Sequence, residues 1–451
     1  MIRRTLTKAY GTAIIARHLI GQRRNPYIPD DQLSELRDKR LRQMVRYAAE
    51  TVPFYRDFFV REGLDPAEIH SAADLHRLPL IDKKLVQQRP ERFVSASRWG
   101  RTAIPFPTTG STGTPLTVLH DRHSLLTNAA YSEREREAVR DVLGGRDRFR
   151  VVAIDYETST GNQSREFLRQ HTFLPVSGNR FSLFLTEPIE HIIAAVNRIR
   201  PEVIASYGSF VELLFRTLAA RGIQMHLPKV VLFGSDMMTD AGRRLIESQF
   251  GVVVLSRYNA VEAFKIGFSC RERTGYHLHD DLTHVRLVDK NGNAVAPGEQ
   301  GEVVISNLVN RGTVLLNYRL GDLASTSHER CPCGRNLPLL AGLEGRVEDI
   351  IHLRDGTYVH PRQVCAILET RSEVVQYQLI QHQTDSFELR IATVDRAAFE
   401  KIGGAIVADL RRLLGQAVAI DAVHHEQLEP MGRARKLRPV LSLVNPQNWP
   451  R

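Results

Sequence analysis

Short apolar runs alternate with segments of helical periodicity through the middle of the chain. The runs are rich in Val, Ile and Leu and cover residues 149–154, 203–207, 229–234 and 252–256. Apolar residues recur at helical spacing between them, over 188–199 and 209–221. Buried strands that alternate with helices predict an α/β body whose strands are mainly parallel.

Two further helical patterns precede this region. Apolar residues recur at roughly helical spacing from 32 to 60, where Pro53 interrupts the pattern, so this segment is expected to form one helix or two. Residues 122–142 are rich in Glu and Arg and are expected to form a long polar helix.

The pattern changes after residue 285. A β-type run, a turn at 290–293 and a second run at 301–306 predict two strands, in a smaller β-rich unit on the α/β body. The last hundred residues, beginning with a strand at 350–354, predict the order β-α-β-β-α-β of a small ferredoxin-like α+β unit. The predicted domains are therefore a basic N-terminal helix at 1–30, a large body at 31–345 and a small mobile C-terminal domain at 346–451.

The positive charge of the chain is concentrated at its two ends. Of the formal net charge of +10, residues 1–24 carry +6 and residues 431–451 carry +5, so the body between them has a net charge of −1. A basic face for nucleic acid is therefore not expected. No uncharged apolar run approaches the roughly 18 residues of a membrane span.

The N-terminal stretch places apolar residues among cations. It is compatible with a helix packed on the body, with contact to an anionic surface, or with a transit peptide. Its apolar centre is short and Arg17 and His18 interrupt it, which favours a packed or frayed helix in a cytoplasmic protein.

The segment at 108–114 combines two glycines with four hydroxyl side chains, and a fifth hydroxyl closes it. In order it contains Thr108, Thr109, Gly110, Ser111, Thr112, Gly113 and Thr114. Glycine lets backbone N–H groups turn toward a ligand, and hydroxyls add donors suited to phosphate oxygens. The segment is expected to be a loop over a polyphosphate, with a plain surface turn as the alternative.

Four other positions are candidates for chemistry. Glu262 follows the strand at 252–256, where α/β folds bind ligands, and can hold Mg²⁺; Tyr258, four residues earlier, can stack on a base. Asp322 follows a glycine turn and can accept from ribose hydroxyls. Lys436 lies in a basic segment of the mobile domain and can stabilise charge during adenylyl transfer, or be an ordinary solvated cation.

Four cysteines are too few for a disulfide scaffold in a chain of 451 residues. Cys331 and Cys333 form a tight Cys-Pro-Cys knuckle and, with Cys270 and one histidine, would complete a closed tetrahedral zinc site of structural type. Either His277 or His279 can supply the imidazole. Cys365 is expected to lie in the core.

Taken together, these motifs resemble the phenylacetate–CoA ligase family, with its capsule-synthesis (CapK-like) relatives, within the adenylate-forming enzymes. The resemblance covers most of the chain, and its order and spacing carry more weight than any single motif. The matching segments are 47–56, 78–84, 108–115, 234–236, 258–262, 318–322, 346–349 and 436–442.

The resemblance implies ATP-dependent activation of a carboxylic acid to an acyl-adenylate, with release of pyrophosphate and transfer to coenzyme A. It implies that Lys436 is the adenylation lysine, that Glu262 serves Mg-ATP, and that a zinc knuckle contains Cys270, His277, Cys331 and Cys333. Further nucleotide contacts are implied for Ser235, Asp236, Tyr258, Asn259, Asp322 and Arg346.

Some positions depart from the family pattern and keep other outcomes open. Thr114 stands where Lys is frequent, Arg435 where Gly is usual, Glu348 where Asp is common and Asp236 where Glu is common. The acceptor is therefore coenzyme A, an amine or a carrier protein, and a catalytically silent nucleotide-binding relative is a further alternative. The acid and the oligomeric state, a homodimer among the options, are left open.

Overall fold

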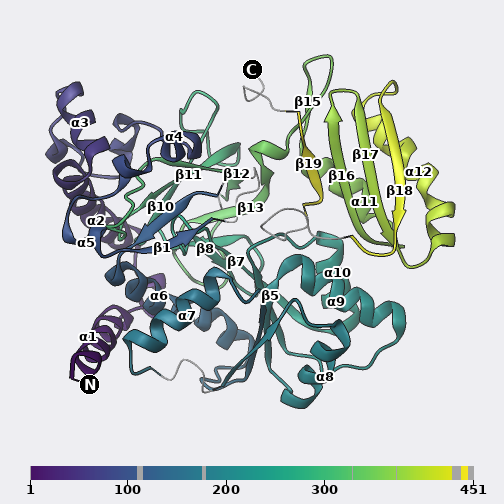
Figure 1. Cartoon of the computed structure of the whole chain (residues 1–451), viewed down its shortest axis with the longest axis horizontal. Helices are drawn as coiled ribbons and strands as arrows, with labels where there is room; N and C mark the ends of the chain where they lie inside the picture. Colours follow the sequence, from purple (N-terminus) through teal and green to yellow (C-terminus); the bar gives the residue numbers. More distant parts are fainter. Residues whose placement is uncertain are drawn as a thin grey trace.

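The computed structural model describes residues 2–108, 115–174, 179–327, 329–371, 373–428 and 438–444. Figure 1 shows a large body with a smaller C-terminal unit beside it. The α/β class predicted from the alternating pattern is confirmed. The spacing of apolar residues in the sequence accounts for most of the helices and strands.

The N-terminal region is helical. Its helices are α1 (Ile2–Leu19), α2 (Asp30–Thr51), α3 (Pro53–Glu62), α4 (Lys83–Gln88) and α5 (Arg98–Arg101), with 3₁₀ turns η1 (Asn25–Tyr27), η2 (Pro66–Glu68), η3 (Ala72–Arg77) and η4 (Pro90–Phe93). The periodic segment at 32–60 forms two helices because Val52 is extended and Pro53 opens the second helix.

Helix α1 packs on α6 (Arg122–Val142) and α7 (Thr160–His171), as Figure 1 shows at the N-terminal end of the molecule. A Cβ on Gly11 would lie 2.1 Å from the carbonyl oxygen of His171, so the close approach of α1 to the end of α7 requires glycine. The prediction of a packed N-terminal helix is therefore confirmed. Among the described residues, no helix is both long enough and apolar enough to cross a bilayer.

One sheet of eleven strands runs through the body, in the order β10-β11-β12-β13-β9-β8-β7-β6-β5-β3-β4. Its strands are β3 (Val151–Asp155), β4 (Arg180–Phe184), β5 (Val203–Tyr207), β6 (Val230–Gly234), β7 (Val253–Tyr258), β8 (Gly267–Ser269), β9 (Tyr276–Leu278), β10 (Thr283–Val288), β11 (Gln300–Asn307), β12 (Tyr318–Thr326) and β13 (Leu339–Arg346). The strands from β7 to β4 are parallel, as predicted.

The β-rich region after residue 285 extends this sheet instead of forming a unit of its own. Strands β10 and β11 pair antiparallel, as expected, but β7 pairs with β8 and joins the two halves. The prediction of a separate smaller unit was therefore wrong. The sequence pattern shows that strands exist but not which strand edges meet.

Two apolar layers cover the parallel half of the sheet. Helices α8 (Ile189–Ile199), α9 (Gly208–Arg221) and α10 (Asp240–Phe250) pack on one face, where Ile204 and Val231 are buried. Helix α6 packs on the opposite face, where Val203 and Val230 are buried. Because successive side chains of a strand point to opposite faces, odd-numbered residues of β5 and even-numbered residues of β6 belong to the α6 side.

The C-terminal unit is an α+β sandwich whose topology differs from the prediction at its first strand. Its sheet has the order β18-β17-β16-β19, with α11 and α12 packed on it. The elements are β16 (Val374–Gln383), β17 (Ser386–Thr393), β18 (Ala419–His425), β19 (Val440–Ser442), α11 (Pro361–Glu369) and α12 (Arg396–Leu414).

The predicted first strand at 350–354 lies outside this sheet. Strand β14 (Ile351–His352) pairs with β15 (Tyr358–Val359) in a separate ribbon. The position beside β16 is taken by β19, which returns from the end of the chain and pairs parallel to it. The predicted order of elements along the chain is therefore found, but the first strand does not join the sheet, because the short β14 closes a local turn at Gly356.

Candidate functional site

The predicted phosphate loop is held at its base by two short strands. Strands β1 (Ile104–Pro107) and β2 (Thr117–His120) pair antiparallel on either side of it. The backbone N–H of Thr108 donates to Leu116 O at 2.7 Å, and the Thr108 hydroxyl oxygen accepts from Leu116 N at 2.9 Å. The candidate residues Thr109, Gly110, Ser111, Thr112, Gly113 and Thr114 lie outside the described residues.

Tyr258, Asp322 and Arg346 meet although they are far apart in sequence. Asp322 on β12 is the cross-strand partner of Arg346 on β13, and Arg346 Nε lies 3.3 Å from Asp322 Oδ1. The hydroxyl of Tyr258, at the end of β7, donates to Asp322 Oδ2 at 2.7 Å. The Asp322 carboxylate raises the pKa of Arg346, and burial followed by the Asp322 charge raises the pKa of Tyr258. The three side chains form one connected polar network.

Glu262 lies in a turn just after β7 and is buried. Its carboxylate accepts from the Tyr318 hydroxyl at 3.4 Å, and its carbonyl oxygen accepts from Asn307 Nδ2 at 3.1 Å. Burial raises the pKa of Glu262, while the charge of Arg346 opposes this shift. A buried carboxylate beside the Asp322 network is an anion for which a bound cation would compensate.

Three further predicted residues sit where β6 and β7 end. Ser235 adopts φ 72°, a left-handed conformation directly after β6. Asp236 accepts from the backbone N–H of Ser209 at 3.3 Å and from the Ser209 hydroxyl. In its favourable orientation, the amide of Asn259 donates to the carbonyl oxygens of Tyr258 and Phe264 at 2.9 and 3.0 Å. Asn259 therefore shapes the turn that carries Glu262.

Lys436 lies outside the described residues, but the segment that follows it is placed. Arg438 forms ion pairs with Glu348, at 3.5 Å, and with Asp349. Glu348 also pairs with Arg346, at 3.5 Å. The chain two residues after Lys436 is therefore joined by ion pairs to the network of Asp322.

The four predicted metal ligands come together. The Sγ atoms of Cys270, Cys331 and Cys333 and the imidazole of His277 lie within 4.8 Å of one another. Cys270 Sγ is 3.4 Å from Cys331 Sγ, and Cys333 Sγ is 3.4 Å from His277 Nε2. All four cysteines of the chain are free thiols. A tetrahedral zinc with bonds of about 2.3 Å has ligand–ligand edges of about 3.8 Å, so the donor set and its dimensions fit zinc.

His279 takes no part in this cluster. It is fully buried, and its Nε2 lies 3.6 Å from Glu135 Oε1. Burial lowers the pKa of His279 to about 4. Of the two histidines left open by the sequence, the structure brings His277 to the cysteines.

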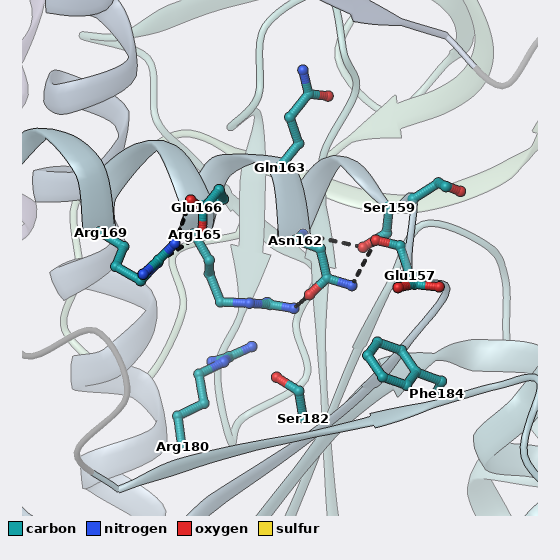
Figure 2. Close-up of a pocket in the computed structure, with 11 residues that line it drawn as sticks. Glu157, Ser159, Asn162, Gln163, Arg165, Glu166, Arg169, Arg180, Ser182 and Phe184 are labelled. Carbon is teal, nitrogen blue, oxygen red and sulfur yellow. Dashed lines mark hydrogen bonds and ion pairs between the residues drawn. The ribbon is translucent and has the colours of Figure 1, made fainter.

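A cavity of about 620 Å³ was not anticipated from the sequence. It lies between α7 and β4, and Figure 2 shows Asn162 and Arg165 above it and Arg180, Ser182 and Phe184 below. These residues belong to no motif, and Arg180 would be read as the polar start of an ordinary strand. No local signal in the sequence marks them.

No protein-family model matches the chain. Among curated proteins, it is similar to the phenylacetate–coenzyme A ligase of Thermus thermophilus, at 29% identity over 398 residues that cover 85% of this chain and 86% of that protein. The phenylacetate–coenzyme A ligase of Aromatoleum evansii is 26% identical over 365 residues, which cover 79% of each chain.

Solved structures of a CoA ligase share the fold of this chain. 2-Hydroxyisobutyryl-CoA ligase in its postadenylation state with 2-HIB-AMP superposes with a TM-score of 0.75 at 18% identity, over 93% of this chain and 91% of that one. The same enzyme with 2-HIB-AMP and CoA has a TM-score of 0.59 at 19% identity, over 92% and 91%. The resemblance predicted from the motifs is therefore confirmed: the fold is that of the adenylate-forming CoA ligases, and along most of its length the chain is related to the phenylacetate–coenzyme A ligases.

Proposed function

We propose that the chain is an AMP-forming ligase that activates a carboxylic acid with ATP and transfers the acyl group to coenzyme A. A carboxylate oxygen attacks the α-phosphorus of ATP, the bond to the β-phosphate oxygen breaks, and pyrophosphate leaves. The thiolate of coenzyme A then attacks the acyl carbon, and AMP leaves. This proposal rests on the network of Tyr258, Asp322 and Arg346, together with the sequence similarity to the phenylacetate–coenzyme A ligases.

The network supplies the groups that a nucleotide needs. Asp322 accepts from the ribose hydroxyls, and Arg346 holds the Asp322 carboxylate in place through an ion pair. Tyr258 orients the other carboxylate oxygen through its hydroxyl and offers its ring to adenine. Ser235, Asp236 and Asn259 line the neighbouring strand ends, beside adenine and the acyl group.

The phosphates belong to the loop at 108–114, whose hydroxyls and N–H groups donate to the β and γ oxygens. Lys436 neutralises charge between the attacking carboxylate and the α-phosphate. The ion pairs of Arg438 with Glu348 and Asp349 support this role, because they fix the following segment beside Arg346. The C-terminal unit then rotates, since one lysine must enter for the first step and leave before the second.

Two metal ions fit residues of the chain. Glu262 would hold the Mg²⁺ that accompanies ATP and offsets phosphate charge. Cys270, His277, Cys331 and Cys333 would hold a structural Zn²⁺. The zinc cluster would tie the ends of β8, β9 and the segment after β12 together, which stabilises the antiparallel half of the sheet.

Pyrophosphate release tests the proposal directly. The folded protein with ATP and Mg²⁺ is assayed against a panel of aryl and fatty acids, and the release is compared with and without coenzyme A. Acid-dependent release and an acyl-CoA product in the mass spectrum are expected. An acyl-adenylate that passes only to amines or to a carrier protein would change the acceptor, and silence with every acid would reject the activity. The cytoplasm, which supplies both ATP and coenzyme A, is the compartment that suits this reaction.

A further inference from the structure

The cavity under α7 is a polar space built into the face of the sheet. The register places Arg180 opposite Val151 and Ser182 opposite Ala153, and Ala153 in turn opposite Ala205. Side chains at these positions point to the same face of the sheet. The small Ser and Ala side chains leave the space that the cavity occupies. Figure 2 shows Arg180 rising from β4 into it, toward Arg165 on α7.

The cavity is lined by three arginines, Arg165, Arg169 and Arg180, and by two glutamates, Glu157 and Glu166. Arg165 pairs with Asp155 at 2.9 Å. Arg180 lines the cavity, and Arg257 lies on the same face of the sheet, on β7. Nε of Arg180 and Nε of Arg257 have no hydrogen-bond partner, and within the described part of the chain neither guanidinium forms an ion pair. Of Arg165, Arg180 and Arg257, only Arg165 forms an ion pair with a carboxylate of the described residues.

Neither lining glutamate forms an ion pair with Arg180 among the described residues. Glu166 is exposed and pairs with Arg169 at 2.7 Å, and Glu157 is exposed. Burial, together with the neighbouring charges of Arg165 and Arg257, lowers the pKa of Arg180 to about 10. A half-buried cation with like charges around it is a site that an anion would relieve.

The cavity adjoins the strand β1, which leads into the loop at 108–114. Gln163, which lines the cavity, donates through Nε2 to Pro105 O at 2.9 Å, on the strand that leads into the loop at 108–114. A ligand in the cavity therefore lies close to the strand that leads into the phosphate loop.

We propose that this cavity receives the tail of the carboxylic acid, and that this tail ends in a second carboxylate bound by Arg180 with Arg257 behind it. This inference rests on the proposed function and names its substrate class, a dicarboxylic acid. A neutral phenyl or alkyl tail would leave both guanidinium groups without an anion and would desolvate them further. A carboxylate accepts two parallel N–H bonds from one guanidinium, which fixes both its position and its orientation.

Matched pairs of acids test the class. Adipate is compared with hexanoate, and 1,4-phenylenediacetate with phenylacetate, so that each pair differs in the distal carboxylate. Pyrophosphate release is measured over a range of acid concentrations. We expect kcat/KM to be at least about tenfold higher for the diacid of a pair, the order expected for a charged hydrogen bond.

Variants of Arg180 test whether this residue causes the preference for diacids. Arg180→Gln is expected to raise KM for the diacid about tenfold and to leave KM for ATP unchanged, and Arg180→Lys is expected to keep part of the preference. Arg198→Gln, on the exposed surface of α8, is the matched control. Thermal unfolding of each variant shows whether the protein is folded, and removal of a cation among cations is not expected to lower Tm.

Binding without turnover separates this inference from the proposed function. Calorimetric titration with the diacid, alone and with a non-hydrolysable ATP analogue, is expected to show binding that Arg180→Gln weakens. If the diacid binds in this way but no pyrophosphate appears, the cavity is assigned correctly and the ligase activity is wrong. If the neutral acids turn over better and Arg180→Gln changes nothing, the ligase stands and the dicarboxylate inference is wrong. Binding of inorganic pyrophosphate in place of diacids, dependent on Arg180, would assign the cavity to the nucleotide and also overturn the inference.

Discussion

The hydroxyl of Tyr258 donates to Asp322 across a separation of 64 residues, at 2.7 Å. Arg346 holds the other carboxylate oxygen of Asp322 at 3.3 Å from its Nε. Both oxygens of one carboxylate are thus engaged before any ligand arrives. A preorganised acceptor of this kind loses little entropy when ribose hydroxyls bind to it.

Replacement of Asp322 by Asn should weaken nucleotide binding. The variant keeps the size of the side chain and an acceptor for Tyr258 but loses the charge that holds Arg346. KM for ATP is expected to rise roughly tenfold or more, the order for a hydrogen bond to a charged group, while KM for the acid changes little. Steady-state pyrophosphate release measures both.

Tyr258→Phe separates the two uses of the tyrosine. If the hydroxyl positions Asp322, this variant should raise KM for ATP by a few-fold, in line with the loss of one hydrogen bond of about 1 kcal/mol. The control for the charge removed in Asp322→Asn is Asp355→Asn, in an exposed turn of the C-terminal unit. An unchanged KM for ATP in both Asp322→Asn and Tyr258→Phe would place the nucleotide elsewhere.

Lys436→Ala should separate the two half-reactions. Loss of the ammonium group is expected to slow adenylation about a hundredfold or more, because preorganised charge at a reacting phosphate contributes at that level. Thioester formation from a synthetic acyl-adenylate and coenzyme A should persist, because the proposed rotation withdraws the lysine before that step. Lys401→Ala, exposed on α12, is the control. Equal losses in both half-reactions would contradict the assignment.

The cysteine cluster should contain one zinc ion per chain. Metal analysis of the purified protein is expected to find it, and Cys331→Ser should abolish it and lower Tm by roughly 5 °C or more, since a structural metal contributes to folding. Cys365→Ser, in the C-terminal unit, should keep the metal. A protein that is fully stable and free of zinc after chelation would show that the four ligands are only packed thiols and an imidazole.

A buried ion pair should make the protein sensitive to acid. Arg134 donates to both oxygens of Asp281, at 2.7 and 3.0 Å, and the Tyr131 hydroxyl donates to Asp281 at 2.6 Å. Burial alone would raise the pKa of Asp281, but the charges of Arg134 and Arg40 outweigh it and hold this pKa below its usual range. Because the folded pKa is depressed, this stability is present above the ordinary pKa of about 3.9 and is lost as the pH falls below it.

Asp281→Asn tests this pair. At pH 7 the variant is expected to lose about 3–5 kcal/mol, because the fully buried Arg134 would be left without its carboxylate. The decline in unfolding free energy between pH 4 and pH 2 should be shallower than in the parent protein. Asp31→Asn, at the exposed start of α2, should change neither quantity measurably. Chemical denaturation across this pH range supplies the comparison, and identical pH profiles for Asp281→Asn and the parent would contradict the prediction.

Local patterns in the sequence predicted a large part of the fold. The apolar runs gave β3, β5, β6 and β7, and Pro53 marked the break between α2 and α3. Such features depend on neighbours within a few residues, through periodicity, turn chemistry and the fixed φ of proline. They carry no record of which edge a strand pairs with, so the continuity of the eleven-stranded sheet and the place of β19 beside β16 could not be foreseen.

By itself, the sequence determined which chemical groups are present and in what order along the chain: the hydroxyl-rich loop, the carboxylates of Glu262 and Asp322, and the Cys-Pro-Cys knuckle. Only the tertiary structure decided how they combine. The pairing of β12 with β13 sets Asp322 against Arg346, and the position of His279 past the end of β9, beside Glu135, leaves His277 to the thiols. Arg180, in the cavity, and Arg257 share a face only because parallel strands far apart in sequence lie in register. Strand register is set by packing, which no local pattern encodes.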